Sequence, residues 1–390
     1  MAKLGEVCLI NPKSCTLRDD TEVSFIPMTK VGEHGEFDAS EIKNYSEVKK
    51  GFTNFQNGDI LFAKITPCME NGKGAIAHNM KNGIGFGSTE FHVLRPDTDK
   101  ITSEWLYYLT TWKTFRKEAE RNMTGSAGQK RVPKTFLENY VVNLPDIDTQ
   151  KSENKILRKV DDLIFLRKQQ LAKLDELVKA RFVEMFGDPA DNVNNLPASP
   201  MTAICQIIDG DRGKNYPKQE EFSDSGFCLF LNAKNVTAQG FSFENCTYIT
   251  EEKDTLLRNG KLCRGDVVLT TRGTIGNLAF YDTSVPYENI RINSGMVILR
   301  MNKQVVSEIF FIEQFKMQLD SIKSRIASGS AQPQLPISTM NKIEMILPPI
   351  ELQKQFAAFV ERVDQQKQTV QQSFEKLELM KKALMQEYFG

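Results

Sequence analysis

Two glycine-rich loops carry polar side chains whose types could read the edges of nucleic-acid bases. Residues 124–131 (Thr-Gly-Ser-Ala-Gly-Gln-Lys-Arg) combine hydroxyl, amide and cationic groups on a flexible backbone. Residues 328–334 (Ser-Gly-Ser-Ala-Gln-Pro-Gln) keep the amides and lack the charges. Gln pairs bidentately with adenine, and Arg or Lys with guanine, in the major groove of DNA. A solvated turn between a helix and a strand would have the same composition, so the loops alone leave both interpretations open.

Further cations and amides lie beside short predicted strands. Residues 211–216 (Asp-Arg-Gly-Lys-Asn-Tyr) offer Arg, Lys, Asn and an aromatic ring, which suits contacts with phosphates and base edges. Singly, each such residue is more often a solvated surface group, but such residues recur beside equivalent strands, which favours a binding role. The candidate DNA-binding residues are Lys64, Asn71, Lys73, Ser126, Gln129, Lys130, Arg131, Arg212, Lys214, Asn215, Arg272, Thr274, Ser330, Gln332 and Gln334.

Signatures of catalysis are missing from the sequence. Residues 72–74 (Gly-Lys-Gly) lack the spacing and the hydroxyl residue of a G-x-x-x-x-G-K-[ST] phosphate loop. The sequence contains neither a G-x-S-x-G elbow nor the Asn/Asp-Pro-Pro-Tyr motif of amino-methyltransferases. Its three histidines, His34, His78 and His92, all lie in the first half. We therefore predict a binding protein, with an enzyme of unfamiliar site as an alternative.

The chain repeats its own pattern. Segments 58–61, 103–108, 124–127 and 144–145 recur in the same order as 265–268, 307–312, 328–331 and 347–348. The offset changes from 207 to 203 along the chain, as expected for a tandem duplication with small loop changes. Two copies of one module predict two similar surfaces with one shared task.

Each copy begins with short β-branched and aromatic runs and continues with a helix. Residues 23–26 and 228–231 read as strands, and a Gly-Asp turn precedes another strand in both copies. Ser103 and Ser307 are expected to cap the helices, the first of which extends to Phe115. The fold class predicted is α+β.

Each copy ends in a long amphipathic helix, at residues 151–187 and 351–390. We predict an antiparallel coiled coil with pseudo-two-fold symmetry that joins two globular domains, residues 1–150 and 188–350. The alternative is that each helix folds back on its own domain. Cations at 167, 367 and 381 interrupt the apolar seam. The residues expected to pair the helices are Val160, Ile164, Leu171, Leu174, Val178, Phe356, Val360, Val363, Val370, Phe374 and Leu377.

Composition indicates a globular protein without a strongly basic region. The chain has 390 residues, 40% of them hydrophobic, and its fifty basic and fifty acidic residues cancel. A stand-alone DNA-binding domain usually shows a basic footprint, so nucleic-acid binding would need local patches or a partner's charge. Seven cysteines without a C-x-x-C pair argue against a disulfide framework and a zinc site. No secretory signal or membrane span is recognisable, and we expect a cytoplasmic protein.

The ordered set of motifs resembles the specificity subunit of type I restriction–modification systems. The resemblance covers the whole chain and rests on the two Gly-Asp segments, residues 272–276 (Arg-Gly-Thr-Ile-Gly), the Gly-Ser-Ala loops and residues 347–355 (Leu-Pro-Pro-Ile-Glu-Leu-Gln-Lys-Gln). The first copy of the last motif, residues 144–151, is a weaker match.

This resemblance implies a division of labour. Each globular module would be a target recognition domain that reads one half of a split, asymmetric site in double-stranded DNA. The helices would set the spacer and dock two modification (methyltransferase) subunits. Those subunits would bring S-adenosylmethionine, and restriction subunits would add ATP- and Mg-dependent activities, so the chain itself would bind no cofactor. An adaptor protein is the main rival, and salt-sensitive, sequence-dependent DNA binding separates the two.

Overall fold

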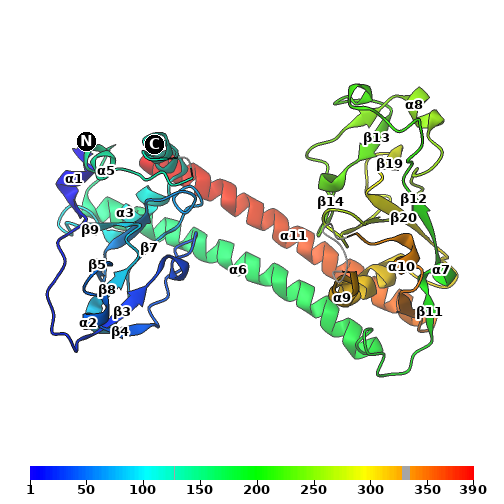
Figure 1. Ribbon diagram of the computed structural model, residues 1–390, viewed down its shortest axis with the longest axis horizontal. Helices are drawn as coiled ribbons and strands as arrows, with labels where there is room; N and C mark the ends of the chain where they lie inside the picture. The colour runs from blue at the N-terminus through cyan, green and yellow to red at the C-terminus, as the bar shows by residue number, and fades with distance from the viewer. Residues whose placement is uncertain (127, 327–333) are drawn as a thin grey trace. The chain divides into compact units, whose positions relative to one another are not determined.

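The computed structural model describes residues 1–126, 128–326 and 334–390. These residues form two compact units (Figure 1), which we call the first unit (residues 1–168 and 372–390) and the second unit (residues 169–371). Both units contain antiparallel-rich sheets beside helices, and each contains part of both long helices. The predicted α+β class is confirmed.

The first unit contains two four-stranded sheets. Their strand orders are β2-β9-β6-β7 and β4-β3-β8-β5. The strands are β2 (Cys8–Ile10), β3 (Glu22–Ile26), β4 (Ile42–Asn44), β5 (Thr53–Gln56), β6 (Ile60–Ala63), β7 (Gly74–Ile76), β8 (Ile84–Gly87) and β9 (Phe91–Pro96). Strands β3 and β8 pair in parallel, and the other neighbours pair antiparallel.

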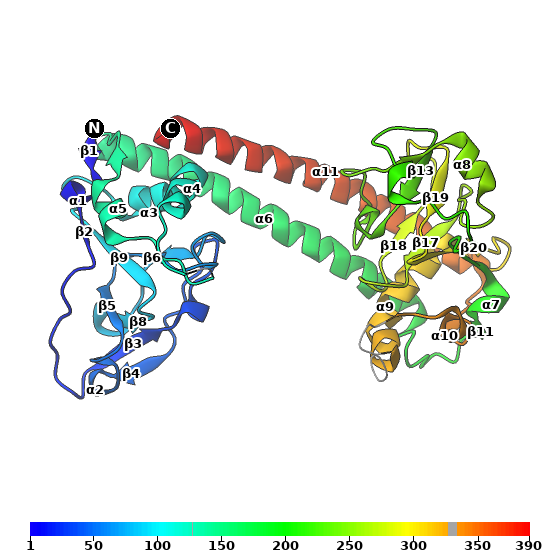
Figure 2. The same cartoon turned by 45° about the horizontal axis from the view of Figure 1, so that its top comes forward.

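Short helices and a two-stranded ribbon complete the first unit. The ribbon pairs β1 (Ala2–Lys3) with β10 (Val141–Val142). The helices are α1 (Leu4–Val7), α2 (Tyr45–Val48), α3 (Ser103–Thr111), α4 (Lys113–Arg121) and α5 (Lys134–Asn139), with 3-10 turns at Met28–Lys30 and Lys81–Gly83. Figure 2 shows α3, α4 and α5 beside the start of α6, and the sheet of β3, β4, β5 and β8 at the other end of this unit.

The second unit repeats this order of elements. Its four-stranded sheet, β12-β20-β17-β18, corresponds to β2-β9-β6-β7, and β13 pairs in parallel with β19 as β3 does with β8. The elements are β11 (Ala198–Pro200), α7 (Met201–Ile204), β12 (Cys205–Asp209), β13 (Cys228–Leu231), β14 (Val236–Thr237), β15 (Gly240–Phe241), β16 (Tyr248–Ile249), α8 (Glu251–Leu256), β17 (Val267–Thr270), β18 (Leu278–Phe280), β19 (Ile290–Ile292), β20 (Met296–Met301), α9 (Glu308–Ile326), α10 (Ile337–Met340) and β21 (Glu344–Ile346), with 3-10 turns at Gln219–Glu221 and Ala233–Asn235.

The repeated Gly-Asp motif is a structural clamp. The buried carboxylate of Asp59 accepts hydrogen bonds from Nε and Nη2 of Arg95, at 2.8 and 2.7 Å, and from the backbone N–H of Gln56. In the second unit Asp266 accepts the same two bonds from Arg300, both at 2.8 Å. Because bidentate Arg–carboxylate pairs fix geometry as well as charge, each motif ties the start of one strand to its neighbour.

A buried glutamine docks each long helix on its unit. The side-chain oxygen of Gln150 accepts a hydrogen bond from the N–H of Thr102, and its amide donates to the carbonyls of Lys100 and Pro145. Gln353 makes the corresponding bonds with Ser307, Val305 and Pro348. The Leu-Pro…Gln-Lys motif therefore couples helix to domain in both copies.

The long helices are α6 (Ile147–Phe186) and α11 (Ile350–Phe389). Helix α6 begins four residues before the predicted start, because Asp146 accepts hydrogen bonds from the N–H groups of Asp148 and Thr149 and so satisfies donors that a helix start leaves free.

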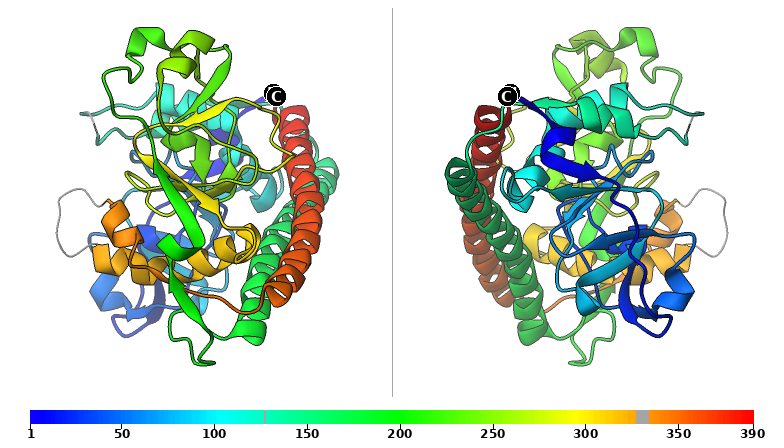
Figure 3. Two further views of the ribbon diagram at one scale, coloured as in Figure 1. Left: turned by 90° about the vertical axis from the view of Figure 1, so that its right-hand side faces the viewer. Right: turned by 90° about the vertical axis from the view of Figure 1, so that its left-hand side faces the viewer.

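The two long helices run antiparallel within each unit (Figure 3). In the first unit Asp161 pairs with Lys381 at 2.6 Å, and Arg167 Nε donates to Ser373. In the second unit Asp175 pairs with Lys367 at 2.5 Å. As the residue number rises along α6, the number of the residue that it contacts on α11 falls. The predicted antiparallel pair is confirmed, and the fold-back alternative is wrong.

The residues predicted to pair the helices are all buried or half-buried, and their pairing roles stay predictions. Val160, Val178, Phe356, Val360, Val363 and Val370 are buried, whereas Ile164, Leu171, Leu174, Phe374 and Leu377 are half-buried. Each of the three seam cations has an acceptor on the other helix: Ser373 for Arg167, Asp175 for Lys367 and Asp161 for Lys381.

Two predictions about the first internal helix are wrong. The helix breaks at Trp112, whose extended backbone separates α3 from α4 while its buried ring packs within 6.4 Å of Phe389. The cap of α3 is Thr102, whose hydroxyl accepts from the N–H of Trp105, and Ser103 instead donates to the carbonyl of Gly58.

No helix among the described residues has the length and apolar character needed to cross a membrane.

Candidate nucleic-acid interface

The second unit brings three predicted residues together at one strand end. Arg212, Arg272 and Gln334 line a hollow of about 300 Å³ together with Asp209 and residues 335–337. Arg272 and Gln334 face each other across an isolated antiparallel bridge, next to the hydrogen bond from Leu335 N–H to the carbonyl of Thr271. Both side chains are exposed. The hollow therefore contains two guanidinium groups, one amide and the carboxylate of Asp209.

Arg212 lies in a turn that also carries the carboxylates of Asp209 and Asp211, and hydrogen bonds hold its side chain there. Its Nη2 donates to Asp209 at 3.1 Å and to the carbonyl of Ser294 at 3.3 Å, while about half of the side chain stays exposed. Burial acts to raise the pKa of Asp211, but hydrogen bonds from the N–H groups of Gly213 and Arg258 outweigh it and lower that pKa. An ionised Asp211 thus shapes the turn that carries Arg212.

The loop after β17 is fixed by a close approach to helix α9. Gly276 has φ +94°, and a Cβ there would lie 2.2 Å from Cδ1 of Leu319, so glycine is required. Ile275 is buried, whereas Thr274 is exposed. The loop exposes Arg272 and Thr274 to solvent.

The first unit places its glycine-rich loop at the corresponding strand end. The N–H of Thr124 donates to the carbonyl of Arg131 at 3.0 Å, and the N–H of Arg131 donates to the carbonyl of Thr124 at 2.8 Å. The N–H of Val132 donates to the carbonyl of Lys64, as the N–H of Leu335 does to the carbonyl of Thr271 in the second unit. The N–H of Thr66 donates to Lys130. Lys64, Lys130 and Arg131 are thereby neighbours, and Asn71, Ser126, Gln129 and Lys130 are exposed.

Three predicted residues make internal bonds. Arg131 forms a bidentate pair with Glu90, at 2.9 and 2.8 Å, and this hydrogen bonding lowers the pKa of Glu90. Lys73 donates to the carbonyl of Met28 at 3.2 Å, and the Asn215 amide donates to that of Leu256 at 3.1 Å. Their DNA contacts stay predictions. Lys214 is exposed, and Ser330 and Gln332 lie outside the described residues.

His92 is buried, and both of its ring nitrogens have hydrogen-bond partners within the protein. Its Nε2 lies 2.8 Å from the carbonyl of Val132, and its Nδ1 lies 2.9 Å from the side-chain amide of Asn11. Burial lowers the pKa of His92 below its usual value, which keeps the ring neutral at physiological pH. His34 and His78 are exposed.

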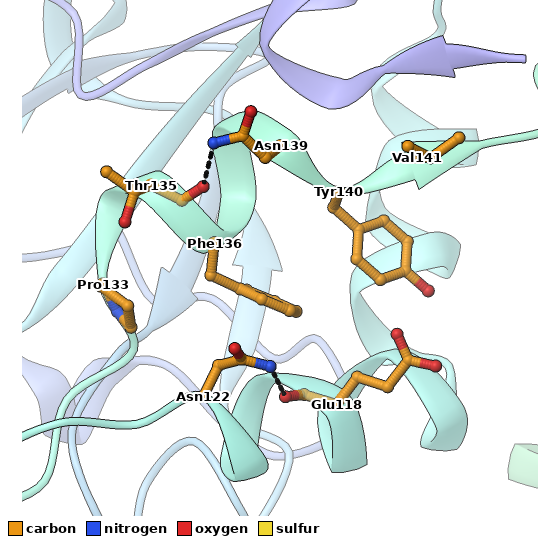
Figure 4. A pocket seen from close by; sticks show the side chains of 8 residues that line it. All are labelled: Glu118, Asn122, Pro133, Thr135, Phe136, Asn139, Tyr140 and Val141. Atoms are coloured by element: carbon orange, nitrogen blue, oxygen red, sulfur yellow. Dashed lines mark hydrogen bonds between the residues drawn. The ribbon is translucent and has the colours of Figure 1, made fainter.

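A hollow that sequence reasoning missed lies in the first unit between α4 and α5 (Figure 4). Its volume is about 640 Å³, and the rings of Phe136 and Tyr140 lie above Glu118. Burial, with a smaller contribution from Glu118, raises the pKa of Tyr140 to about 12. Its lining carries a carboxylate and no cation, so this hollow is unsuited to phosphate.

Comparison with known proteins agrees with this geometry. A specificity subunit of the type I restriction enzyme EcoAI from Escherichia coli is 46% identical over 178 residues, 44% of this chain and 30% of that protein. The putative MjaX specificity subunit from Methanocaldococcus jannaschii is 22% identical over 377 residues, 93% of this chain and 83% of that protein. The chain thus matches less than a third of the first relative's length.

Solved structures share the fold. The S subunit of a type I restriction–modification system from M. genitalium has a TM-score of 0.57 and 15% identity, covering 100% of this chain and 95% of that one. A structure from work on complex assembly and conformational transition of the type I R-M system has a TM-score of 0.53 and 16% identity, covering 99% and 96%.

Two repeated α+β units, each with a polar loop at one strand end and a share of two paired helices, define a class of DNA specificity proteins. The family model for the type I restriction modification DNA specificity domain matches residues 1–176 and 201–379, and the chain belongs to this family. The resemblance predicted from the motifs is confirmed. The family is described as a DNA specificity domain, in agreement with the binding protein expected from the sequence.

Proposed function

We propose that the chain selects the DNA sequence for a type I restriction–modification complex and leaves catalysis to partner subunits. Each unit reads one half of a bipartite, asymmetric site in double-stranded DNA. The observation that carries this proposal is that the same strand end bears different polar side chains in the two units. Lys64, Lys130 and Arg131 surround the strand end after β6, and Arg212, Arg272 and Gln334 surround the one after β17. Different side chains in one frame are what two readers of unlike sequences need.

The balanced charge of the chain supports a role inside a larger complex. Residues 1–150 contain 19 basic and 20 acidic residues, and residues 188–350 contain 16 and 18. Phosphate neutralisation supplies much of the affinity of DNA-binding proteins. Two modification subunits, which also bring S-adenosylmethionine, contribute that charge, and restriction subunits with ATP and Mg²⁺ complete the complex. We place the chain in the cytoplasm, where it meets DNA.

The paired helices set the spacer and dock the modification subunits. A continuous helix of 40 residues is about 60 Å long at about 1.5 Å per residue. Half-site centres separated by on the order of one DNA turn, about 10 base pairs, suit such a spacer element.

Exchange of one recognition domain tests the proposal. Residues 1–150 are replaced by the corresponding domain of a specificity subunit with another target, and the methylated sequence is determined in the assembled complex. We expect one half of the recognised sequence to change and the other half to persist. The reciprocal exchange of residues 188–350 is the matched control and should change the other half. A change in both halves after either exchange would contradict the assignment.

A further inference from the structure

Arg116 on α4 is a buried cation without a carboxylate partner among the described residues. Its side chain is 7% exposed, and its guanidinium carbon lies 5.0 Å from the centre of the Phe62 ring. Nη1 donates to the carbonyl of Met69 at 2.6 Å, and Nη2 donates to that of Lys73 at 3.4 Å. Both carbonyls belong to residues 64–73, the loop that joins β6 to β7. The guanidinium therefore spans the inside of this loop.

The charge of Arg116 is retained at a cost. Burial lowers the pKa of Arg116 to about 10, which still leaves the group protonated at neutral pH. Its Nε is buried without a hydrogen-bond partner. Buried charges are costly unless they are paired or fully hydrogen-bonded. An apolar side chain would avoid this cost but would donate no hydrogen bond to the carbonyls of Met69 and Lys73.

This arrangement belongs to the first unit. The loop between β17 and β18, residues 271–277, is three residues shorter than residues 64–73, which accounts for the change of repeat offset from 207 to 204. The shorter loop rests on Leu319 through Gly276. At the offset of 204 the counterpart of Arg116 is Asp320, which is exposed. Thus the longer loop and its buried arginine occur together.

The loop held by Arg116 lies beside the glycine-rich loop of residues 124–131. Thr66 N–H donates to Lys130, and Thr66 Oγ1 lies 3.8 Å from the sulfur of Met123. The exposed Asn71, a candidate DNA contact, lies between the two residues that Arg116 binds, and the candidate Lys64 begins the same loop. The conformation of residues 64–73 therefore decides where the polar groups of this strand end point.

We propose that Arg116 is a positioning residue for one half-site: it holds residues 64–73 in the conformation that reads DNA in the first unit, and the second unit does not depend on it. This inference rests on the proposed function. Arg116 acts through main-chain carbonyls and does not touch DNA. Its loss should loosen sequence recognition in one half of the site only, whereas a general loss of stability would weaken both halves.

Three variants of the full chain, assembled with its modification subunits, test this inference. R116M keeps an unbranched side chain but removes both donors and the charge, and R116K keeps the charge and one donor to Met69. R121M, on the exposed end of α4, is the matched control. Methylated sites are mapped by sequencing, and affinity is measured on DNA with either half-site scrambled. Thermal unfolding identifies variants that fold.

The expected pattern is specific to one half-site. R116M should lose at least tenfold in discrimination between the correct and altered first half-site, with the second half-site read as in the wild type. R116K should fall between R116M and the wild type, and R121M should match the wild type. If R116M does not fold, R116K decides by the same readout. Unchanged recognition, or equal loss in both halves, would overturn the role of Arg116. A wild-type chain without a bipartite site would instead overturn the proposed function itself.

Discussion

Replacing Arg272 with alanine is expected to weaken DNA binding about 5- to 150-fold and to relax recognition in one half of the site. A bidentate contact between Arg and guanine discriminates by roughly 1–3 kcal/mol, and about 1.4 kcal/mol corresponds to tenfold in affinity. Arg272 is exposed beside Gln334 on a loop that Gly276 fixes against α9. Arg212→Ala should act on the same half-site. Titration of labelled DNA with the assembled complex measures both effects.

Lys303→Ala is the control for a lost positive charge. Lys303 lies between β20 and α9, where its 65% exposed side chain pairs with Glu308 at 3.1 Å. We expect this variant to bind like the wild type. If Arg272 contacts a phosphate and no base, its loss should weaken binding to all sequences alike and reduce the salt dependence by about one counterion. Wild-type affinity and specificity in both arginine variants would contradict the proposed interface.

Phe182→Ala is expected to destabilise the second unit by about 3–5 kcal/mol, the usual cost of removing a fully buried aromatic side chain. Phe182 is completely buried, and its ring lies 5.1 to 5.4 Å from the rings of Phe186, Phe310 and Phe356. These rings join α6, α9 and α11, so the cavity would loosen the helix pair and the domain core together. Denaturant unfolding followed by fluorescence and circular dichroism measures the change.

Val183→Ala is the matched control because it removes apolar atoms from the next residue of the same helix. The Val183 side chain is 45% exposed, so its truncation should change the free energy of unfolding by less than about 1 kcal/mol. Equal effects of the two substitutions would show that the aromatic cluster does not hold the helix end on the second unit.

The elements with strong periodicity could be predicted from the sequence. Forty residues without Gly or Pro and with a regular apolar seam define α6 and α11, and the repeat offsets locate equivalent strands. The antiparallel pairing also followed, because two long apolar faces in one chain bury each other. The Gly-Asp and Leu-Pro…Gln-Lys repeats were recognised as motifs, but their work as clamps through Asp59 and Gln150 depends on partners distant in sequence.

The candidate interface was predicted less completely, since a polar side chain has the same type whether it faces solvent or its own protein. Glu90 lies 41 residues before Arg131, and nothing in the local sequence pairs them. Arg116 was missed for the same reason. An arginine among the charged residues of α4 reads as a solvated group, and only the packing of Phe62 and residues 64–73 buries it.

The assignment of two recognition domains to one DNA site can be tested by sequencing methylated bases in cells that carry the complete system, with and without this chain. We expect methylation in the presence of the chain to fall on one bipartite sequence, whose two unlike defined parts are separated by a constant number of unspecified base pairs. Without the chain, that methylation should disappear. Methylation of a single uninterrupted sequence, or an unchanged pattern without the chain, would contradict the proposal that two recognition domains of this chain bind half-sites separated by a fixed spacer.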